Sequence, residues 1–310
     1  MEHALKPVSL VGDDSIKRVH AAGDRLMSLS NLRYEGTFLS VGHYENVHVM
    51  EFGSGPPVLL VHGAGSGGPA WHRQIAALAV DHRVIVPDVP MFGLSGMPHR
   101  IHSPREQIAD VTLGIMDLLD IETADIAGHS MGALASLGAL MRAPNRFKRA
   151  VLLSSPGFGR GLNFVLRLAS VPALQRFVDY GSRRARNVYF DFFEAQKSGP
   201  SDERELWKEL HFQVGNRDNG IETFHQGLTS FAGISGQRDV IAPQMATKIK
   251  AKTLLIWGDS DRIIPTRHSK RANELIPGAR LEIIENCGHI VQLEAPQRVT
   301  ALMSDWFRVS

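Results

Sequence analysis

A single serine lies between two glycines in the segment ADIAGHSMGALA, residues 124–135. An apolar run precedes it and an Ala/Leu-rich run follows, so Ser130 is predicted at a turn between a strand and a helix. Gly128 and Gly132 carry no side chains, which allows the two backbones to approach closely at such a turn. The free amide groups at the start of the helix would then face negative charge that develops beside the hydroxyl. The pattern is typical of a serine nucleophile.

A serine hydroxyl needs a general base, and the base needs an acid that orients it. We expect both in the loops after later strands. His289, in NCGHIVQLEAP, follows the last predicted strand, and no other histidine follows position 268. For the acid, the loop SSPGFG offers no carboxylate, whereas GDSDRIIP offers Asp259 and Asp261. We assign Asp261, which lies just before the turn into the next helix; Asp259, the alternative, is expected to cap that turn or lie at the surface.

The negative oxygen formed in acyl transfer needs two backbone N–H donors. The amide of Met131, directly after the serine, is one candidate. The second is the amide of Ala64 in the glycine-rich loop HGAGSGGPAW, where Gly63 lets a ligand approach the backbone closely. This loop lacks the Gly-Lys-Ser/Thr ending of a phosphate-binding P-loop and the G-x-G-x-x-G spacing of a dinucleotide site.

Alternating apolar and amphipathic segments must position these residues. Continuous apolar runs predict buried strands, helical patterns lie between several of them, and this order is typical of a parallel, doubly wound α/β sheet. The runs are 57–63, 82–90, 123–127, 149–156, 252–261 and 279–289, the helices 69–80, 104–120 and 130–142, and a hairpin-like pair of strands is expected at 36–41 and 46–52.

Two segments depart from this alternation. Residues 157–245 are rich in Phe, Tyr and Arg and predict several helices between two sheet strands, so we expect a helical cap over a core made of residues 33–156 and 246–310. We expect residues 1–32 to form an N-terminal helical extension, in which 15–30 have helical spacing. We expect this extension to pack on the body; docking of a partner is the alternative.

The composition limits the kinds of partner and cofactor that we expect for this protein. The 310 residues carry 34 Lys and Arg against 32 Asp and Glu, which offers no basic face for nucleic acid, and we expect the local run Arg183, Arg184 and Arg186 to be a solvated helix face. The single cysteine, Cys287, excludes a disulfide within the chain.

No apolar stretch is long enough to span a membrane, so we expect a soluble cytoplasmic protein without a membrane partner. The 14 histidines are scattered without a metal-binding motif, and we expect neither metal nor cofactor. A homodimer is compatible with the sequence.

The order Ser130, Asp261, His289, together with VHGAG and PDVPMFGLSG (87–96), resembles the α/β-hydrolase family over about residues 35–308. The resemblance implies a mostly parallel eight-stranded sheet with helices on both faces and a helical cap after the sixth strand. It also implies an acyl-enzyme route. Family members with Asp at the elbow open epoxides or displace halide, and Ser130 makes those activities unexpected here.

The leading functional expectation is a serine hydrolase of small carboxylic esters. One alternative is a lactonase or a C–C bond hydrolase of aromatic ring-fission products; another is a ligand receptor on a hydrolase scaffold. The C–C hydrolases usually carry Asn before the nucleophile and Trp after the catalytic His. This chain has His129 and Ile290 there, which resembles the esterases and lactonases more closely.

A small-molecule substrate, an apolar ester, is expected to contact five residues. They are Gly63, His129, Phe158, Phe164 and Ile290. Other aromatic residues of the cap could wall the same pocket: Phe177, Tyr180, Tyr189, Phe190, Phe192 and Phe193. Arg160 and Arg167 are expected to face solvent.

Overall fold

The sheet is the central element of the computed structural model, which describes residues 6–7, 13–98, 101–175, 181–194 and 201–308. Its strand order is β2-β3-β5-β4-β6-β7-β10-β11, with the two-residue β1 added beside β2. The strands from β5 to β11 in this order pair in parallel, whereas β2 and β3 pair antiparallel. The bounds are β1 Lys6–Pro7, β2 Thr37–Val41, β3 Tyr44–Phe52, β4 Pro57–Val61, β5 Arg83–Pro87, β6 Ala124–His129, β7 Phe147–Leu153, β10 Lys252–Gly258 and β11 Arg280–Ile284.

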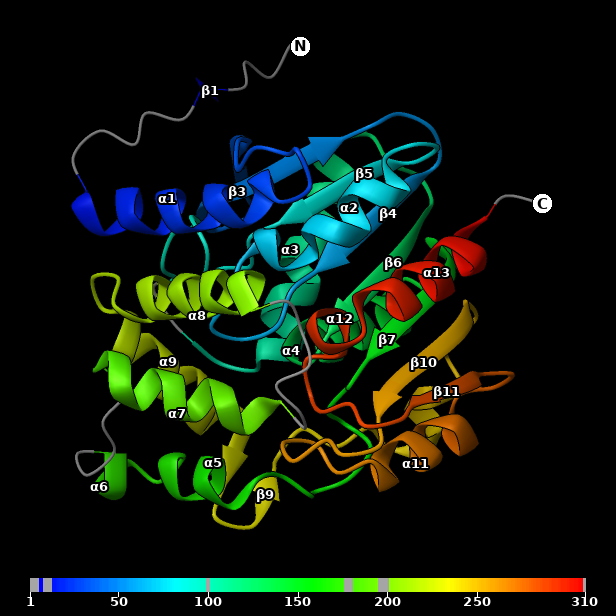
Figure 1. The fold of residues 1–310 in the computed structure, drawn as a ribbon. Helices are drawn as coiled ribbons and strands as arrows, with labels where there is room; N and C mark the ends of the chain where they lie inside the picture. The colour runs from blue at the N-terminus through cyan, green and yellow to red at the C-terminus, as the bar shows by residue number, and fades with distance from the viewer. Residues whose placement is uncertain (1–5, 8–12, 99–100, 176–180, 195–200, 309–310) are drawn as a thin grey trace.

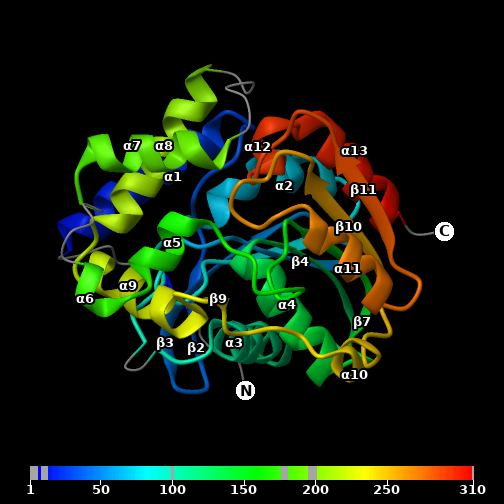
Figure 2. The ribbon, with the colours of Figure 1, turned by 90° about the horizontal axis from the view of Figure 1, so that it is seen from below.

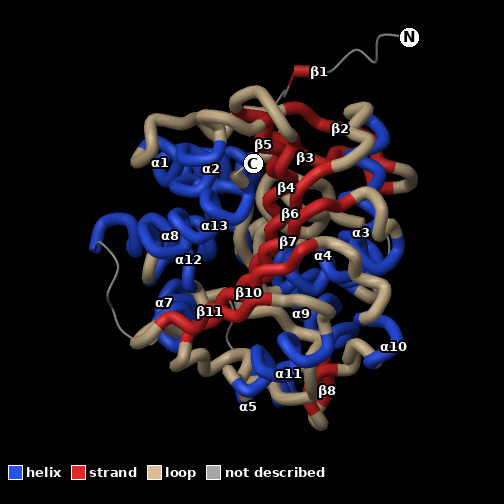
Figure 3. Tube along the Cα trace, turned by 90° about the vertical axis from the view of Figure 1, so that its right-hand side faces the viewer, coloured by secondary structure: helices blue, strands red, loops and turns tan. Residues whose placement is uncertain are grey.

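Helices cover both faces of the sheet, as Figure 3 shows edge-on: α2 and α13 lie on one side, α3 and α4 on the other. The strands between these layers read as continuous apolar runs because both of their faces are buried; Val58 to Val61 of β4 are fully inaccessible. The predicted α/β class with its mostly parallel eight-stranded sheet is therefore confirmed. The N-terminal helix is α1 Asp14–Ser28, and α10 Pro243–Ala246 lies where the chain returns to the core. The core helices are η1 Gly68–Trp71, α2 His72–Leu78, α3 Pro104–Leu118, α4 Met131–Arg142, α11 Arg267–Leu275, α12 Val291–Glu294 and α13 Pro296–Phe307.

Two predicted elements differ from the structure by more than a shift of two or three residues at an end. The helix expected at 69–80 is a 3₁₀ turn with Pro69 at its start, followed by α2. The strand expected at 279–289 ends at Ile284, because the chain turns at Asn286, whose φ is 53°. This early end leaves the segment through His289 as a loop.

The segment 157–245, here called the cap segment, contains five complete helices and a hairpin of two short strands among its described residues, and α10 begins at its end. Figures 1 and 2 show these helices gathered on one side of the molecule, together with α1. The elements are α5 Phe164–Ala169, α6 Pro172–Gln175, α7 Arg183–Phe193, α8 Ser201–Gly215, α9 Gly220–Phe231, β8 Ala232–Gly233 and β9 Gly236–Gln237.

The N-terminal helix α1 packs against α8 of the cap segment and against the core. Asp13 caps the helix by accepting hydrogen bonds from the amides of Ser15 and Ile16. At Gly23 an added Cβ would lie 2.3 Å from the Tyr34 ring, so the glycine permits close packing of α1 on the core. None of the described helices is both long and apolar enough to cross a membrane.

A buried carboxylate, Asp88, joins four parts of the chain just after β5. Its oxygens accept hydrogen bonds from the Tyr34 hydroxyl (2.5 Å), His48 Nδ1 (2.9 Å) and the amides of Gly68 (2.6 Å) and Leu94 (2.9 Å). Burial alone would raise the pKa of Asp88, but the hydrogen bond and charge of His48 and the other donors outweigh it and lower the pKa to about 2. The ionised carboxylate thus fixes the loop 62–68 against β3 and the loop after β5.

Replacing Asp88 by Asn should destabilise the fold by about 3 kcal/mol at pH 7. The amide NH2 of Asn cannot accept a hydrogen bond, so it would face donors that the carboxylate now accepts and leave them without a partner. Urea denaturation measures the free energy of unfolding directly. The matched control is Asp117→Asn, which removes an exposed ion pair with Arg146 and should cost below about 1 kcal/mol.

The same carboxylate predicts a pH dependence. Its folded pKa of about 2 lies below the ordinary value of 3.8, so its stabilisation, about 2 kcal/mol, is present above pH 4 and lost as the pH falls towards 2. The gap in unfolding free energy between the parent and Asp88→Asn should therefore narrow over that range. A gap that stays constant down to pH 2 would contradict this account.

Candidate active site

The turn between β6 and α4 holds Ser130 in an uncommon backbone conformation, with φ 52° and ψ −118°. A non-glycine residue adopts such a conformation only where its surroundings enforce it. Here the Ser130 amide donates to the carbonyl of Leu153 on the neighbouring strand (2.9 Å). A Cβ on Gly128 would lie 2.5 Å from the Gly132 carbonyl, and one on Gly132 would lie 2.2 Å from the Val61 carbonyl. The two glycines therefore permit the turn that the sequence predicts.

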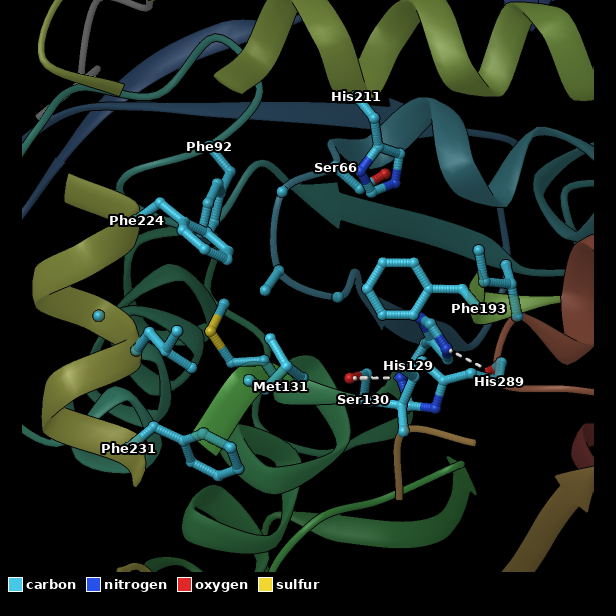
Figure 4. Close-up of a pocket in the computed structure, with 18 of the residues that line it drawn as sticks. Ser66, Phe92, His129, Ser130, Met131, Phe193, His211, Phe224, Phe231 and His289 are labelled. Carbon is cyan, nitrogen blue, oxygen red and sulfur yellow. Dashed lines mark hydrogen bonds between the residues drawn. The ribbon is translucent and has the colours of Figure 1, made fainter. Parts of the chain in front are cut away.

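A chain of hydrogen bonds runs from Ser130 through His289 to Asp261. Ser130 Oγ lies 2.9 Å from His289 Nε2, and His289 Nδ1 lies 2.9 Å from Asp261 Oδ2; Figure 4 shows the first of these contacts. A proton on Nδ1 that points at the carboxylate leaves Nε2 free to accept the serine proton. The structure thus brings together the three residues that the sequence singles out, from three different loops.

Two further contacts fix the ends of this chain. Asp261 Oδ1 accepts the amides of Ile263 (2.8 Å) and Ile264 (2.9 Å), so the carboxylate presents its other oxygen to His289. The His289 amide donates to the Phe193 carbonyl of the cap segment (2.8 Å), and the Phe193 ring stacks on the imidazole with 5.8 Å between ring centres. Asp259, the alternative acid, is exposed on the turn and accepts from Ser260 Oγ and the Cys287 amide instead.

The loop after β4 presents a backbone amide beside Ser130. His62 Nδ1 donates to the Gly63 carbonyl (2.8 Å), while its Nε2 accepts from the Val89 amide (3.0 Å). These two contacts require a neutral imidazole, and burial lowers the pKa of His62 accordingly. Because C=O and N–H of a trans peptide point in opposite directions, the Ala64 amide points away from His62. Ala64 is exposed to the pocket that Ser130 and Met131 also line.

Met131 supplies a second amide at this place. It is the first residue of α4, and the first amides of a helix have no acceptor within the helix. Together the amides of Ala64 and Met131 can stabilise an anionic oxygen next to Ser130.

His129 connects the serine turn to the histidine loop. Its Nε2 donates to the His289 carbonyl (2.9 Å), and the two rings lie 5.1 Å apart. Burial, followed by the charge of His289, lowers the pKa of His129 well below its ordinary value, so the ring stays neutral. Against this ring packs Gly63, where an added Cβ would lie 2.8 Å from His129 Nδ1. His129 therefore positions the His289 loop as well as lining the pocket.

The pocket above Ser130 has an apolar arm and a polar arm, as Figure 4 shows. The apolar arm is lined by Met91, Phe92, Met131, Phe224, Gly227, Leu228 and Phe231. The polar arm contains Ser66 and His211, and Arg186, which also lines the pocket, lies close enough to His211 for its charge to act on that imidazole. Burial, then the nearby charge of Arg186, lowers the pKa of His211 to about 3, so this imidazole is neutral at pH 7. Within the described residues the buried Ser66 hydroxyl has no hydrogen-bond partner.

Three of the five residues expected to contact substrate line this pocket: Gly63, His129 and Ile290. The other two expectations are wrong. Phe158 is buried in the main core, and Phe164 is 62% exposed because α5 turns Leu166 and Ala169 inward instead. Arg186, expected to face solvent, lines the pocket.

Sequence reasoning missed the aromatic residues of α9. Phe224, Leu228 and Phe231 recur at helical spacing and could have indicated an inward face. Of the other cap aromatics, Phe193 lines the pocket, whereas Phe177, Tyr180 and the Tyr189 side chain lie outside the described part of the chain. In that described part, no group of three or more His, Cys, Asp or Glu side chains could hold a metal ion.

The geometry predicts that Ser130 reacts with a fluorophosphonate probe. His289→Ala should slow labelling by about 100-fold or more, because the base is lost, and Asp261→Asn should slow it comparably, because the imidazole loses its orientation. Intact-mass spectrometry over time measures the rate, and peptide mapping identifies the modified residue. Ser28→Ala, at an exposed position on α1, is the control that should label at the parental rate. Equal labelling rates in all variants would show that the hydrogen-bonded chain does not activate the serine.

Comparison with known proteins finds a matching family model and similar hydrolases. The family model described as alpha/beta hydrolase fold matches residues 56–296. The chain is 32% identical over 280 residues to a 2-hydroxy-6-oxo-2,4-heptadienoate hydrolase of Pseudomonas putida, covering 86% of this chain and 94% of the relative. It is 30% identical to a 2-hydroxymuconate semialdehyde hydrolase of Pseudomonas sp. strain CF600, covering 86% and 92%.

Solved structures of other hydrolases have a similar fold. A 2-hydroxy-6-oxo-6-phenylhexa-2,4-dienoate hydrolase of Rhodococcus sp. strain RHA1 is similar with a TM-score of 0.76 and 25% identity over 88% of this chain and 98% of its own. The carboxylesterase CesB of Bacillus subtilis shares the fold, with a TM-score of 0.76 and 23% identity over 94% and 98%. The chain belongs to the α/β hydrolase fold family and is an enzyme of the hydrolase class.

Proposed function

We propose that this chain is a serine hydrolase that cleaves a C–C bond in 2-hydroxy-6-oxo-dienoates, the ring-fission products of aromatic degradation. The observation that carries the proposal is the hydrogen-bonded chain Ser130–His289–Asp261 between an apolar and a polar arm, in a sequence 32% identical to a heptadienoate hydrolase. Ester hydrolysis, the leading expectation from sequence, fits less well because the two curated relatives described above are hydrolases of ring-fission products.

The two arms suit the two ends of such a substrate. The dienoate end carries a hydroxyl and a carboxylate. The cationic Arg186 can donate hydrogen bonds to the carboxylate, and the polar groups of Ser66 and His211 can bind the hydroxyl. The opposite end is the acyl substituent on the ketone, which is apolar and belongs in the arm formed by α9 and the loop around Phe92. In this orientation the ketone carbon lies at Ser130.

The reaction begins with ketonisation of the dienol, in which the hydroxyl proton moves to the carbon beside the ketone. His289 then takes the Ser130 proton as the oxygen attacks the ketone carbon, and the amides of Ala64 and Met131 stabilise the oxyanion. When the C–C bond breaks, its electron pair delocalises over the dienoate, and the fragment receives the proton from His289. A water molecule, deprotonated by His289, releases the acyl group as a carboxylic acid. One water is consumed, and Asp261 orients the imidazole throughout.

A substrate comparison tests this function. The chain should hydrolyse 2-hydroxy-6-oxo-hepta-2,4-dienoate with kcat/KM of about 10⁴ M⁻¹s⁻¹ or more, and p-nitrophenyl acetate about 100-fold less efficiently. Loss of the dienol absorbance and release of p-nitrophenol measure the two rates. Ser130→Ala should lose about 10³-fold or more on both substrates.

Other outcomes would assign another activity. Preference for the ester by a similar factor would identify an esterase. If no dienoate, ester or lactone were turned over while a dienoate raised the melting temperature, the scaffold would be a receptor.

A further inference from the structure

Gly227 occupies the middle of the inward face of α9. Thr223, Phe224, Leu228 and Phe231 lie on the same face at helical spacing, and the three apolar ones line the pocket. Gly227 lines it too, so the apolar arm has a gap where the other positions of the helix face carry side chains.

A glycine inside a helix lowers helix stability relative to alanine and therefore needs a reason. The other glycines within described helices have one, because an added Cβ would clash: 2.3 Å from Tyr34 at Gly23, 2.4 Å from Val41 at Gly114, 2.2 Å from the Val61 carbonyl at Gly132. An added Cβ would also lie within 3.0 Å of a neighbouring atom at the remaining glycines of the described helices, which are Gly68, Gly138, Gly215 and Gly220.

At Gly227 neither packing nor backbone conformation supplies the reason. The nearest atoms to an added Cβ are Met91 Sδ at 3.9 Å and Cε at 4.0 Å, which is ordinary contact distance. Its φ is not among the positive values of the described chain. What the missing side chain provides is space in the apolar arm.

We propose that Gly227 determines the largest acyl group that the enzyme accepts. That the occupant is the substituent on the ketone rests on the proposed function. The arm around Gly227 is lined by the apolar Met91, Phe224 and Leu228, so the carboxylate end of a substrate would lose its hydration there without compensation. A side chain at position 227 would fill the space that a large substituent, such as phenyl, requires, and would leave room for methyl.

The test compares two substrates in three variants. With 2-hydroxy-6-oxo-dienoates that carry methyl or phenyl on the ketone, Gly227→Leu should lower kcat/KM about tenfold or more for phenyl and by less than about threefold for methyl. Gln226→Leu, the matched control, adds the same side chain at an exposed position on the opposite face of α9 and should leave the phenyl-to-methyl ratio unchanged. Gly227→Ala should raise or preserve the melting temperature, because alanine is the better helix former.

Two results would overturn the proposal. One is an equal effect of Gly227→Leu on both substrates; the other is a lower melting temperature of Gly227→Ala, which would mean that the glycine serves packing. If the parent cleaves neither dienoate, the proposed function fails. The limit that position 227 sets on the size of a group in the apolar arm can still be measured with inhibitors. Methyl- and phenylphosphonofluoridate label Ser130 without turnover, and the same shift in their rate ratio is expected in Gly227→Leu.

Discussion

The backbone turn at Ser130 is the constraint on which the rest of the structure depends. With φ at 52°, the turn stores strain that only close packing can hold, and Gly128 and Gly132 make that packing feasible by removing side chains between β4, β6 and α4. The turn raises one hydroxyl above the sheet and aims the start of α4 at it. Each further part of the site is arranged around that fixed point, including His289 and the amide of Ala64.

Buried polar groups transmit this order to the loops around the serine. Asp88 accepts four hydrogen bonds from separate segments and fixes the loop that carries Ala64, while neutral His62 sets the direction of its peptide group. His129 does the same for the His289 loop through one hydrogen bond to its carbonyl. The geometry around Ser130 therefore depends on buried groups, two of which, Asp88 and His62, do not line the pocket. Such support is typical of sites built on loops between rigid strands.

Most of the fold and the hydrogen-bonded chain at Ser130 could be predicted from sequence, since buried strands have continuous apolar runs and their carboxyl ends meet at one edge. Ser130, His289 and Asp261 are brought together there for that reason. The cap segment could not be predicted to the same depth. Whether a residue of a short helix such as Phe164 faces inward depends on how that helix packs, which no local pattern specifies. The role of Gly227 needs the neighbouring side chains, because a gap is a property of the packed structure.

The most direct test of the central claim is whether Ser130 becomes acylated during C–C cleavage. Rapid acid quenching of the parent enzyme with excess 2-hydroxy-6-oxo-hepta-2,4-dienoate, followed by mass analysis of its peptides, would detect the intermediate. The account predicts an acetyl group on the peptide containing Ser130, formed as fast as the dienol fragment is released in the first turnover. Release of that fragment while the Ser130 peptide stays unmodified at every time point would contradict a nucleophilic serine.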